Sequence, residues 1–304
     1  MKKNMNLNGL LKTASVASIL TAILLIVVKI IAYLVTGSVS ILSSLFDSMQ
    51  DFMTSAVNYA AVKHSTQPAD NEHRFGHGKA EGIGSLVQGI IILAAAFFLL
   101  KESLVRFFET EPIKDISFGV WITVLSIVVT IILVRFQSYV IKKTNSLSIK
   151  ADQAHYTGDI LMNVGVIVSM VAAYYLDLYV IDALFGIGVA VYLFVVVFGV
   201  AKEAISMLMD TELDNSIRES IEQEALSYKE VHSVHDLKTR KSGDVMFIQF
   251  CVKMDDDLTL KKAHDIADLI EEGIQKKYAG AQVLIHFEPA LTKDAKWLLI
   301  RKKK

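Results

Sequence analysis

The sequence predicts a polytopic α-helical membrane protein with six transmembrane helices, followed by a small α/β domain on the cytoplasmic side. Hydrophobic residues make up 53% of the 304 residues and charged residues 21%. The apolar residues occur in long clusters, which is the pattern of a membrane protein. After Ala201 the charge density rises and short apolar runs alternate with charged ones, as in a water-soluble domain.

Six stretches are long enough to cross a bilayer, because about 20 mainly apolar residues in a helix span a hydrocarbon core. The second and fifth stretches carry charges within their apolar sequence. We expect spans near residues 14–36, 39–62, 82–100, 116–138, 150–176 and 178–200. These spans form a first domain, residues 1–207, and residues 208–304 form a second.

Lysine and arginine are distributed unevenly between the two sets of predicted loops. The amino terminus and the loops containing Lys63 and Lys142 are basic, whereas the hinges near Gly37 and Asp177 contain no basic residue. The loop with Lys101 is an exception, because it contains basic residues on the predicted outer side, but acidic residues in the same loop match their charge. Basic loops stay in the cytoplasm, so both termini are expected there.

Two pairs of polar residues lie inside predicted spans at helical spacing. Asp47 and Asp51 are separated by one helical turn, and so are His155 and Asp159. Residues at this spacing share one face of a helix. An ionisable group in a span costs about 2.5–3.5 kcal/mol, so two such pairs indicate a function. If the two helices pack face to face, three carboxylates and one imidazole form a site for a borderline divalent cation such as zinc or ferrous iron.

Other roles are open for each of these polar groups. An intramembrane acid also serves as a proton relay or as the partner of a buried cation. Lys29 in the first span is the candidate cation, and the sequence leaves open whether it pairs with Asp182 or extends toward the membrane surface. Because two i,i+4 pairs occur together, we favour a metal site.

The loop after the second span reads QPADNEHRFGHGKAEG and contains three further metal-ligand side chains. These are Asp70, His73 and His77. The glycines at 76 and 78 permit the chain to wrap tightly around an ion. Composition alone leaves two interpretations open, a metal site and a solvated polar loop.

The second domain shows an α-β-β-α-β order that fits a small two-layer α/β fold. We expect a helix near 214–228, strands near 232–240 and 245–254, a helix near 259–278 and a strand near 282–288. Cys251 lies on the more polar face of the second strand. As the single cysteine it excludes an intrachain disulfide and agrees with a reducing compartment. The formal net charge of −1 gives no indication of a nucleic-acid partner.

Three motifs closely resemble the cation diffusion facilitator family and, within it, the bacterial ferrous-iron and zinc efflux pumps. The motifs are SILSSLFDSMQDFMTSAVNYAAV, QPADNEHRFGHGKAEG and HYTGD. The resemblance covers essentially the whole chain. It implies a six-span protomer with a cytoplasmic ferredoxin-like domain, and a homodimer in the bacterial inner membrane. It also implies exchange of metal for protons, which is transport and not enzyme catalysis.

The resemblance also assigns residues to three metal sites. The transport site matches Asp47, Asp51, His155 and Asp159, and the loop site matches Asp70, His73 and His77. A two-metal cluster at the dimer interface matches His235, Cys251, His264, His286 and Glu288. Three acids and one histidine in the transport site imply zinc with tolerance of iron or cadmium.

Two positions of the second domain depart from the commoner pattern of the family. Cys251 stands where histidine is usual in the family, and Glu288 stands where aspartate is usual. Both side chains are competent zinc ligands. Lys79 and Asp210 match a pair that in relatives holds the spans to the second domain.

Two alternatives compete with a metal/proton antiporter that works by alternating access. An intramembrane metalloprotease needs a stretch such as His-Glu-x-x-His, and the sequence has none. A membrane-anchored metal sensor without transport does not require the buried acids. Metal binding requires deprotonated carboxylates and neutral imidazole, so protons and metal compete for the same side chains. His155 is expected to respond most strongly to pH.

Overall fold

The computed structural model describes residues 2–36, 39–108, 117–176 and 180–290. The chain divides into two compact units, Met1–Leu208 and Met209–Lys304.

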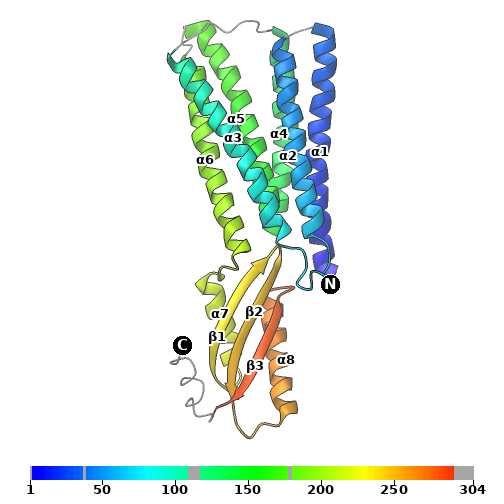
Figure 1. Cartoon of the computed structure of the whole chain (residues 1–304), viewed down its shortest axis with the longest axis vertical. Coiled ribbons are helices and arrows are strands. Elements are labelled where there is room, and N and C mark those ends of the chain that lie inside the picture. Colours follow the sequence, from blue (N-terminus) through cyan, green and yellow to red (C-terminus); the bar gives the residue numbers. More distant parts are fainter. Residues whose placement is uncertain (1, 37–38, 109–116, 177–179, 291–304) are drawn as a thin grey trace. The chain divides into compact units, whose positions relative to one another are not determined.

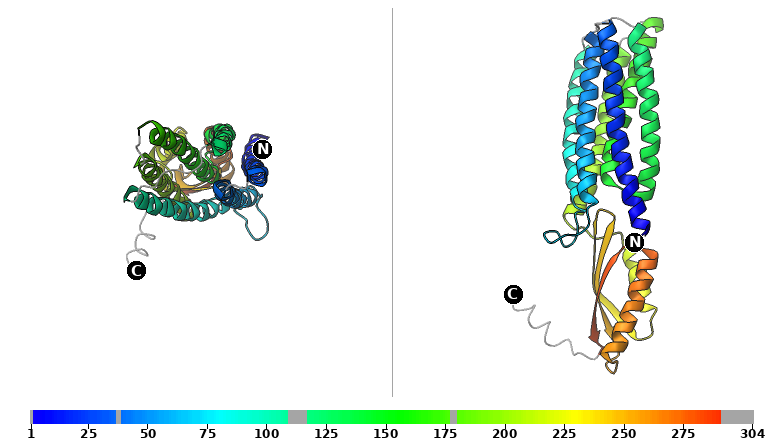
Figure 2. Two further views of the ribbon diagram at one scale, coloured as in Figure 1. Left: turned by 90° about the horizontal axis from the view of Figure 1, so that it is seen from above. Right: turned by 90° about the vertical axis from the view of Figure 1, so that its right-hand side faces the viewer.

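The first unit is a bundle of six long helices that run side by side (Figures 1 and 2). They are α1 (Lys2–Thr36), α2 (Val39–Ser65), α3 (Ala80–Phe108), α4 (Ser117–Thr144), α5 (Leu147–Leu176) and α6 (Val180–Leu208). The shortest, α2, has 27 residues and a length of about 40 Å at 1.5 Å per residue. Every predicted span therefore corresponds to one helix. Helix α1 begins at Lys2, twelve residues before the predicted span, because the more polar segment that precedes the apolar run is also helical.

Four of the described helices are both long enough and apolar enough to cross a membrane, namely α1, α3, α4 and α6. The other two, α2 and α5, have the length but carry the polar residues of the candidate site. The two helices that fall short of a simple apolar composition, α2 and α5, are therefore the two that carry the predicted site.

Helix α3 packs against α6 through a shared apolar core formed by Ile92, Ala96, Val189, Leu193 and Val197. Small residues permit close approach of the helices, as is common in membrane bundles. A Cβ atom added at Gly84 of α3 would lie 2.1 Å from the Cβ atom of Ala61 in α2. The backbones of α2 and α3 are thus in near contact at this position.

The second unit has the predicted α-β-β-α-β order. Its elements are α7 (Asn215–Leu226), β1 (Val231–Ser242), β2 (Val245–Met254), α8 (Leu260–Lys277) and β3 (Gln282–Pro289). The sheet order is β1-β2-β3, with β1 antiparallel and β3 parallel to β2. Gly243 makes the turn between β1 and β2 with a φ of 61°, a conformation that glycine adopts without strain.

Helices α7 and α8 cover one face of this sheet (Figure 1). Ile221 of α7 and Ile270 of α8 share one core with Ile248 and Val252 of β2. Because side chains alternate along a strand, Cys251 lies on the opposite face. That face has no covering element from the described part of its own unit.

Candidate metal-transport site

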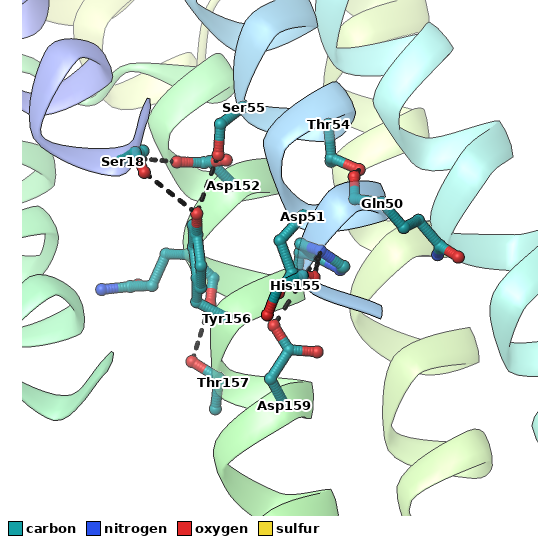
Figure 3. A network of polar contacts seen from close by, with 12 residues as sticks. Ser18, Gln50, Asp51, Thr54, Ser55, Asp152, His155, Tyr156, Thr157 and Asp159 are labelled. Atoms are coloured by element: carbon teal, nitrogen blue, oxygen red, sulfur yellow. Dashed lines mark hydrogen bonds and ion pairs between the residues drawn. The ribbon is translucent and has the colours of Figure 1, made fainter. Parts of the chain in front are cut away.

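Helices α2 and α5 bring three predicted ligands together inside the bundle (Figure 3). The Nε2 atom of His155 lies 3.1 Å from Oδ1 of Asp51 and 3.9 Å from Oδ2 of Asp159. One ligand atom from each of the three residues lies within 4.8 Å of the others. The side chains of His155 and Asp51 are only 8% and 13% exposed, and that of Asp159 is 32% exposed. The three groups are therefore close enough to share one small ion.

The fourth predicted ligand, Asp47, does not belong to this group of close ligand atoms. It lies one turn before Asp51 on α2 and is exposed in the single chain. The i,i+4 spacing places both aspartates on one stripe of α2. It does not determine which turn of that stripe meets α5, since this depends on how the two helices cross.

The chemistry of the three ligands fits a divalent cation. Two carboxylates and one imidazole are donors that zinc and ferrous iron both accept. A tetrahedral ion held by these three side chains would need one further ligand. The buried Oδ2 atom of Asp159 has no hydrogen-bond partner among the described residues. A buried carboxylate oxygen without a donor is unfavourable unless something binds it.

The loop between α2 and α3 brings its three predicted ligands together as well. Oδ2 of Asp70 lies 3.3 Å from Nε2 of His77, and the rings of His73 and His77 are 4.5 Å apart between centroids. Oδ1 of Asp70 also accepts hydrogen bonds from the backbone N–H groups of His73 and Glu72, at 2.6 and 2.9 Å. These backbone bonds, that of His73 first, lower the pKa of Asp70. Gly76 turns the chain with a φ of 82°.

In the second unit, a further cluster lies on the uncovered face of the sheet. His235, Cys251 and Glu288 offer ligand atoms within 4.8 Å of one another. Cys251 is paired with His235 on β1 and with His286 on β3, so His235, Cys251 and His286 form one row across the three strands. Nε2 of His286 lies 3.6 Å from Oε1 of Glu288. Burial, and then the nearby Glu288 carboxylate, raises the pKa of the Cys251 thiol.

His264, which was predicted to belong to this cluster, lies apart from it in the single chain. It lies on α8 beside Asp268, with 3.1 Å between Nδ1 and Oδ2. Helix α8 covers the face of the sheet opposite to the row of His235, Cys251 and His286. The predicted pair of Lys79 and Asp210 would join the two units and stays a prediction.

The structure answers the question that the sequence left open for Lys29. Its ammonium group donates to the carbonyl oxygen of Ser44 at 2.9 Å and to Oγ of Ser48 at 2.7 Å, both on α2. Lys29 is 7% exposed, so it does not extend to the surface. Asp182 instead makes an ion pair with Arg106 at 3.0 Å.

Sequence reasoning missed one buried carboxylate near the site, that of Asp152. It lies on α5 with no exposed surface and accepts a hydrogen bond from Ser18 of α1 at 2.6 Å. A signal was present, because Asp152 precedes His155 by three residues and so falls on the same face of α5.

Comparisons with known proteins cover nearly the whole chain. A family model described as the cation efflux transmembrane domain matches residues 15–209. A second, described as the cytoplasmic domain of cation efflux proteins, matches residues 213–290. The cation-efflux pump FieF of Salmonella paratyphi A is 38% identical over 286 residues, which cover 94% of this chain and 95% of the pump. The corresponding pump of Salmonella arizonae is 37% identical with the same coverage.

Among solved structures, the zinc form of a putative zinc transporter named CzrB is 31% identical. The matched region covers 28% of this chain and 97% of that one, with a TM-score of 0.26.

Proposed function

Because the chain belongs to the cation diffusion facilitator family, we propose that it exports zinc, and also ferrous iron or cadmium, from the cytoplasm in exchange for protons. The protein is a divalent metal cation efflux transporter and not an enzyme. The observation that carries the proposed site is the cluster of Asp51, His155 and Asp159 between α2 and α5. It supports one cation-binding position inside the bundle.

The proposed transport site consists of four ligands, Asp47, Asp51, His155 and Asp159. In the described conformation three of them are gathered, and a tetrahedral ion bound there would need a fourth ligand. Asp47 lies on the same stripe of α2 as Asp51. A small sliding or rotation of α2 along α5 would bring it to this fourth position and complete a tetrahedral shell.

Exchange with protons follows from the chemistry of these ligands. A metal ion binds carboxylates and neutral imidazole, so each bound ion displaces protons from the same side chains. The site alternates between the two sides of the membrane. It loads metal in the cytoplasm and receives protons outside. All six long helices are proposed to span the bacterial inner membrane with both termini in the cytoplasm, and α2 and α5 turn their polar stripe inward.

The other two clusters are proposed as accessory metal sites. Asp70, His73 and His77 bind an ion in the loop between α2 and α3. The predicted cytoplasmic cluster binds metal where two ferredoxin-like domains meet in a homodimer; its residues are His235, Cys251, His264, His286 and Glu288. An uncovered sheet face that carries metal ligands supports such an interface. The proposed membrane domain comprises residues 1–207 and the metal-binding dimerisation domain residues 208–304.

A flux assay in proteoliposomes with an imposed pH gradient tests the proposal. Zinc, ferrous iron, cadmium and manganese are compared for the wild type, Asp51→Ala, His155→Ala and Thr157→Ala. Thr157 is a matched control, because it lies on α5 between two ligands and its hydroxyl donates to the carbonyl of Gln153 in the same helix at 2.7 Å. We expect flux from the wild type and Thr157→Ala, and none from the two ligand variants.

The same assay separates the transporter from the sensor. A wild-type protein that binds zinc but moves none across the membrane under any gradient would favour a membrane-anchored sensor. Full zinc flux in Asp51→Ala would refute the proposed transport site without refuting transport itself.

A further inference from the structure

The buried carboxylate of Asp152 on α5 is held by side chains from three other helices. It accepts hydrogen bonds from Oγ of Ser18 on α1 at 2.6 Å, from Nε2 of Gln88 on α3 at 3.1 Å, and from Nε2 of Gln137 on α4 at 2.7 Å. Gln137 also donates to Ser18 at 3.1 Å. None of these four residues has any exposed surface. We call them the Asp152 cluster.

The hydrogen-bond donors to Asp152 come from neutral side chains, those of Ser18, Gln88 and Gln137. A buried carboxylate needs compensation for the water that it has lost. Here one hydroxyl and two amide groups supply the donors. The carboxylate is thus satisfied by hydrogen bonds that come from fixed points on α1, α3 and α4.

The position of Asp152 links this cluster to the proposed transport site. Asp152, His155 and Asp159 occur at i, i+3 and i+7 and therefore lie on one face of α5. Figure 3 shows Ser18 and Asp152 grouped near the Tyr156 hydroxyl, and Asp51, His155 and Asp159 grouped beside them. A rotation of α5 that broke the first group would also carry His155 away from Asp51.

Tyr156, the residue after His155 on α5, makes further polar contacts to neighbouring helices. Its hydroxyl lies 2.8 Å from Oγ of Ser55 on α2 and donates to the carbonyl of Ser18 at 3.2 Å. Helix α5 is therefore connected by polar contacts to α1, α2, α3 and α4 within one turn of His155. Apolar contacts alone permit a helix to slide or rotate more easily than such directional bonds do.

We propose that Asp152 is a positioning residue, which holds α5 at the rotation and height that place His155 against Asp51. The inference rests on the proposed transport site. The carboxylate suits this role because its two oxygens accept from several helices at once. Its negative charge is not required for positioning, which distinguishes this role from that of a proton carrier or a second cation site.

The amide groups of the cluster make that distinction testable. The Oε1 atoms of Gln88 and Gln137 are buried and have no hydrogen-bond partner among the described residues. An asparagine at position 152 keeps one acceptor oxygen and gains an NH2 group. That group finds an acceptor when one glutamine amide turns over. Asp152→Asn therefore preserves the connections between helices, whereas Asp152→Ala removes them.

The test measures KM and maximal rate of zinc flux for the full chain in proteoliposomes. Asp152→Ala should raise KM about tenfold, the effect of removing a residue that orients metal ligands, and Asp152→Asn should keep a KM close to the wild type. Thr157→Ala is the matched control. It removes a hydrogen bond within α5, from the Thr157 hydroxyl to the carbonyl of Gln153 at 2.7 Å, and leaves the bonds between helices in place. Its KM should not change.

Two results overturn the inference. A wild-type KM in Asp152→Ala shows that the site does not depend on the cluster. A KM in Asp152→Asn as high as in Asp152→Ala shows that the charge, and not the positioning, is needed. If Asp152→Ala does not fold, Gln88→Ala and Ser18→Ala each remove one donor and should raise KM by a smaller factor, and wild-type values in both overturn the inference.

Asp51→Ala serves as the reference variant for this experiment. If it transports zinc normally, the proposed transport site fails. If it abolishes transport while Asp152→Ala has no effect, only the positioning role fails.

Discussion

The Nε2 atom of His155 lies 3.1 Å from the Oδ1 atom of Asp51, across the contact between α5 and α2. This pair joins the two helices that carry the ligands of the proposed transport site. A metal ion that replaces the shared hydrogen bond binds to both helices at once. In the proposed transport cycle, the relative position of α2 and α5 would therefore depend on whether metal or protons occupy the site.

The first prediction concerns metal selectivity. His155→Asp replaces the imidazole with a carboxylate, so all the ligands of the proposed site become oxygen atoms. Oxygen ligands suit manganese, and imidazole suits zinc. The ratio of zinc flux to manganese flux should fall by about tenfold or more. Proteoliposome flux with both metals measures this ratio, and Thr157→Ala should leave it unchanged. An unaltered ratio in His155→Asp would mean that the imidazole does not select the metal.

The second prediction concerns Cys251 and pH. Burial and Glu288 raise the pKa of the thiol, so it is protonated at neutral pH and metal binding must displace that proton. Zinc affinity at the cluster should therefore rise as pH rises toward this pKa, by about tenfold per pH unit for the one proton. Competition with a chromogenic chelator over several pH values measures the slope. Cys251→Ala should reduce that slope by the contribution of one proton, and an equal slope would exclude the thiolate as a ligand.

The third prediction separates two roles of Asp70. Its Oδ1 atom accepts two backbone hydrogen bonds, which Asp70→Asn retains and Asp70→Ala loses. Both variants should bind zinc more weakly at the loop, because both lack the carboxylate charge. Hydrogen exchange at the amides of Glu72 and His73 should accelerate only in Asp70→Ala. Equal acceleration in both variants would show that the turn depends on the charge.

The fourth prediction concerns the contact between α2 and α3. Gly84→Ala places a methyl group 2.1 Å from the Cβ atom of Ala61, which has no flexible end to move aside. The overpacking should destabilise the protein by about 1–3 kcal/mol, seen as a lower temperature of unfolding. Gly188→Ala is the control, because a Cβ atom there meets nothing within 4 Å. Replacing glycine within a helix otherwise stabilises it by about 1 kcal/mol, so this variant should be neutral or more stable.

Helices and strands were predictable where the spacing of apolar residues and the residues that end each element are visible in the local sequence. The strand Val245–Met254 was expected at the bounds observed, because its alternation and the turn at Gly243 are visible in the sequence. The i,i+4 spacing likewise fixed which residues share a face of α2 and α5. The choice between Asp47 and Asp51 as the partner of His155 was not predictable, since it depends on helix packing and not on spacing.

Two further features depended on tertiary structure in the same way. The Asp152 cluster draws Ser18, Gln88 and Gln137 from three helices far apart in sequence, so no local pattern links them. The separation of His264 from Cys251 follows from the face of the sheet that α8 covers. A sequence motif identifies candidate ligands, but it does not state on which side of a sheet each one lies.

The buried ammonium of Lys29 has an electrical consequence for transport. It is bonded to Ser48, the residue that follows Asp47 on α2. Counted over Lys29 and the ligands of the proposed site alone, this ammonium offsets one of three aspartate charges and leaves two, which one divalent ion or two protons would neutralise. A site loaded with either would then cross the membrane field without moving net charge. The rate of zinc flux should therefore be insensitive to an imposed membrane voltage. In Lys29→Gln the loaded site keeps one uncompensated negative charge, so the rate should depend on voltage, since moving one such charge costs about 2.3 kcal/mol per 100 mV.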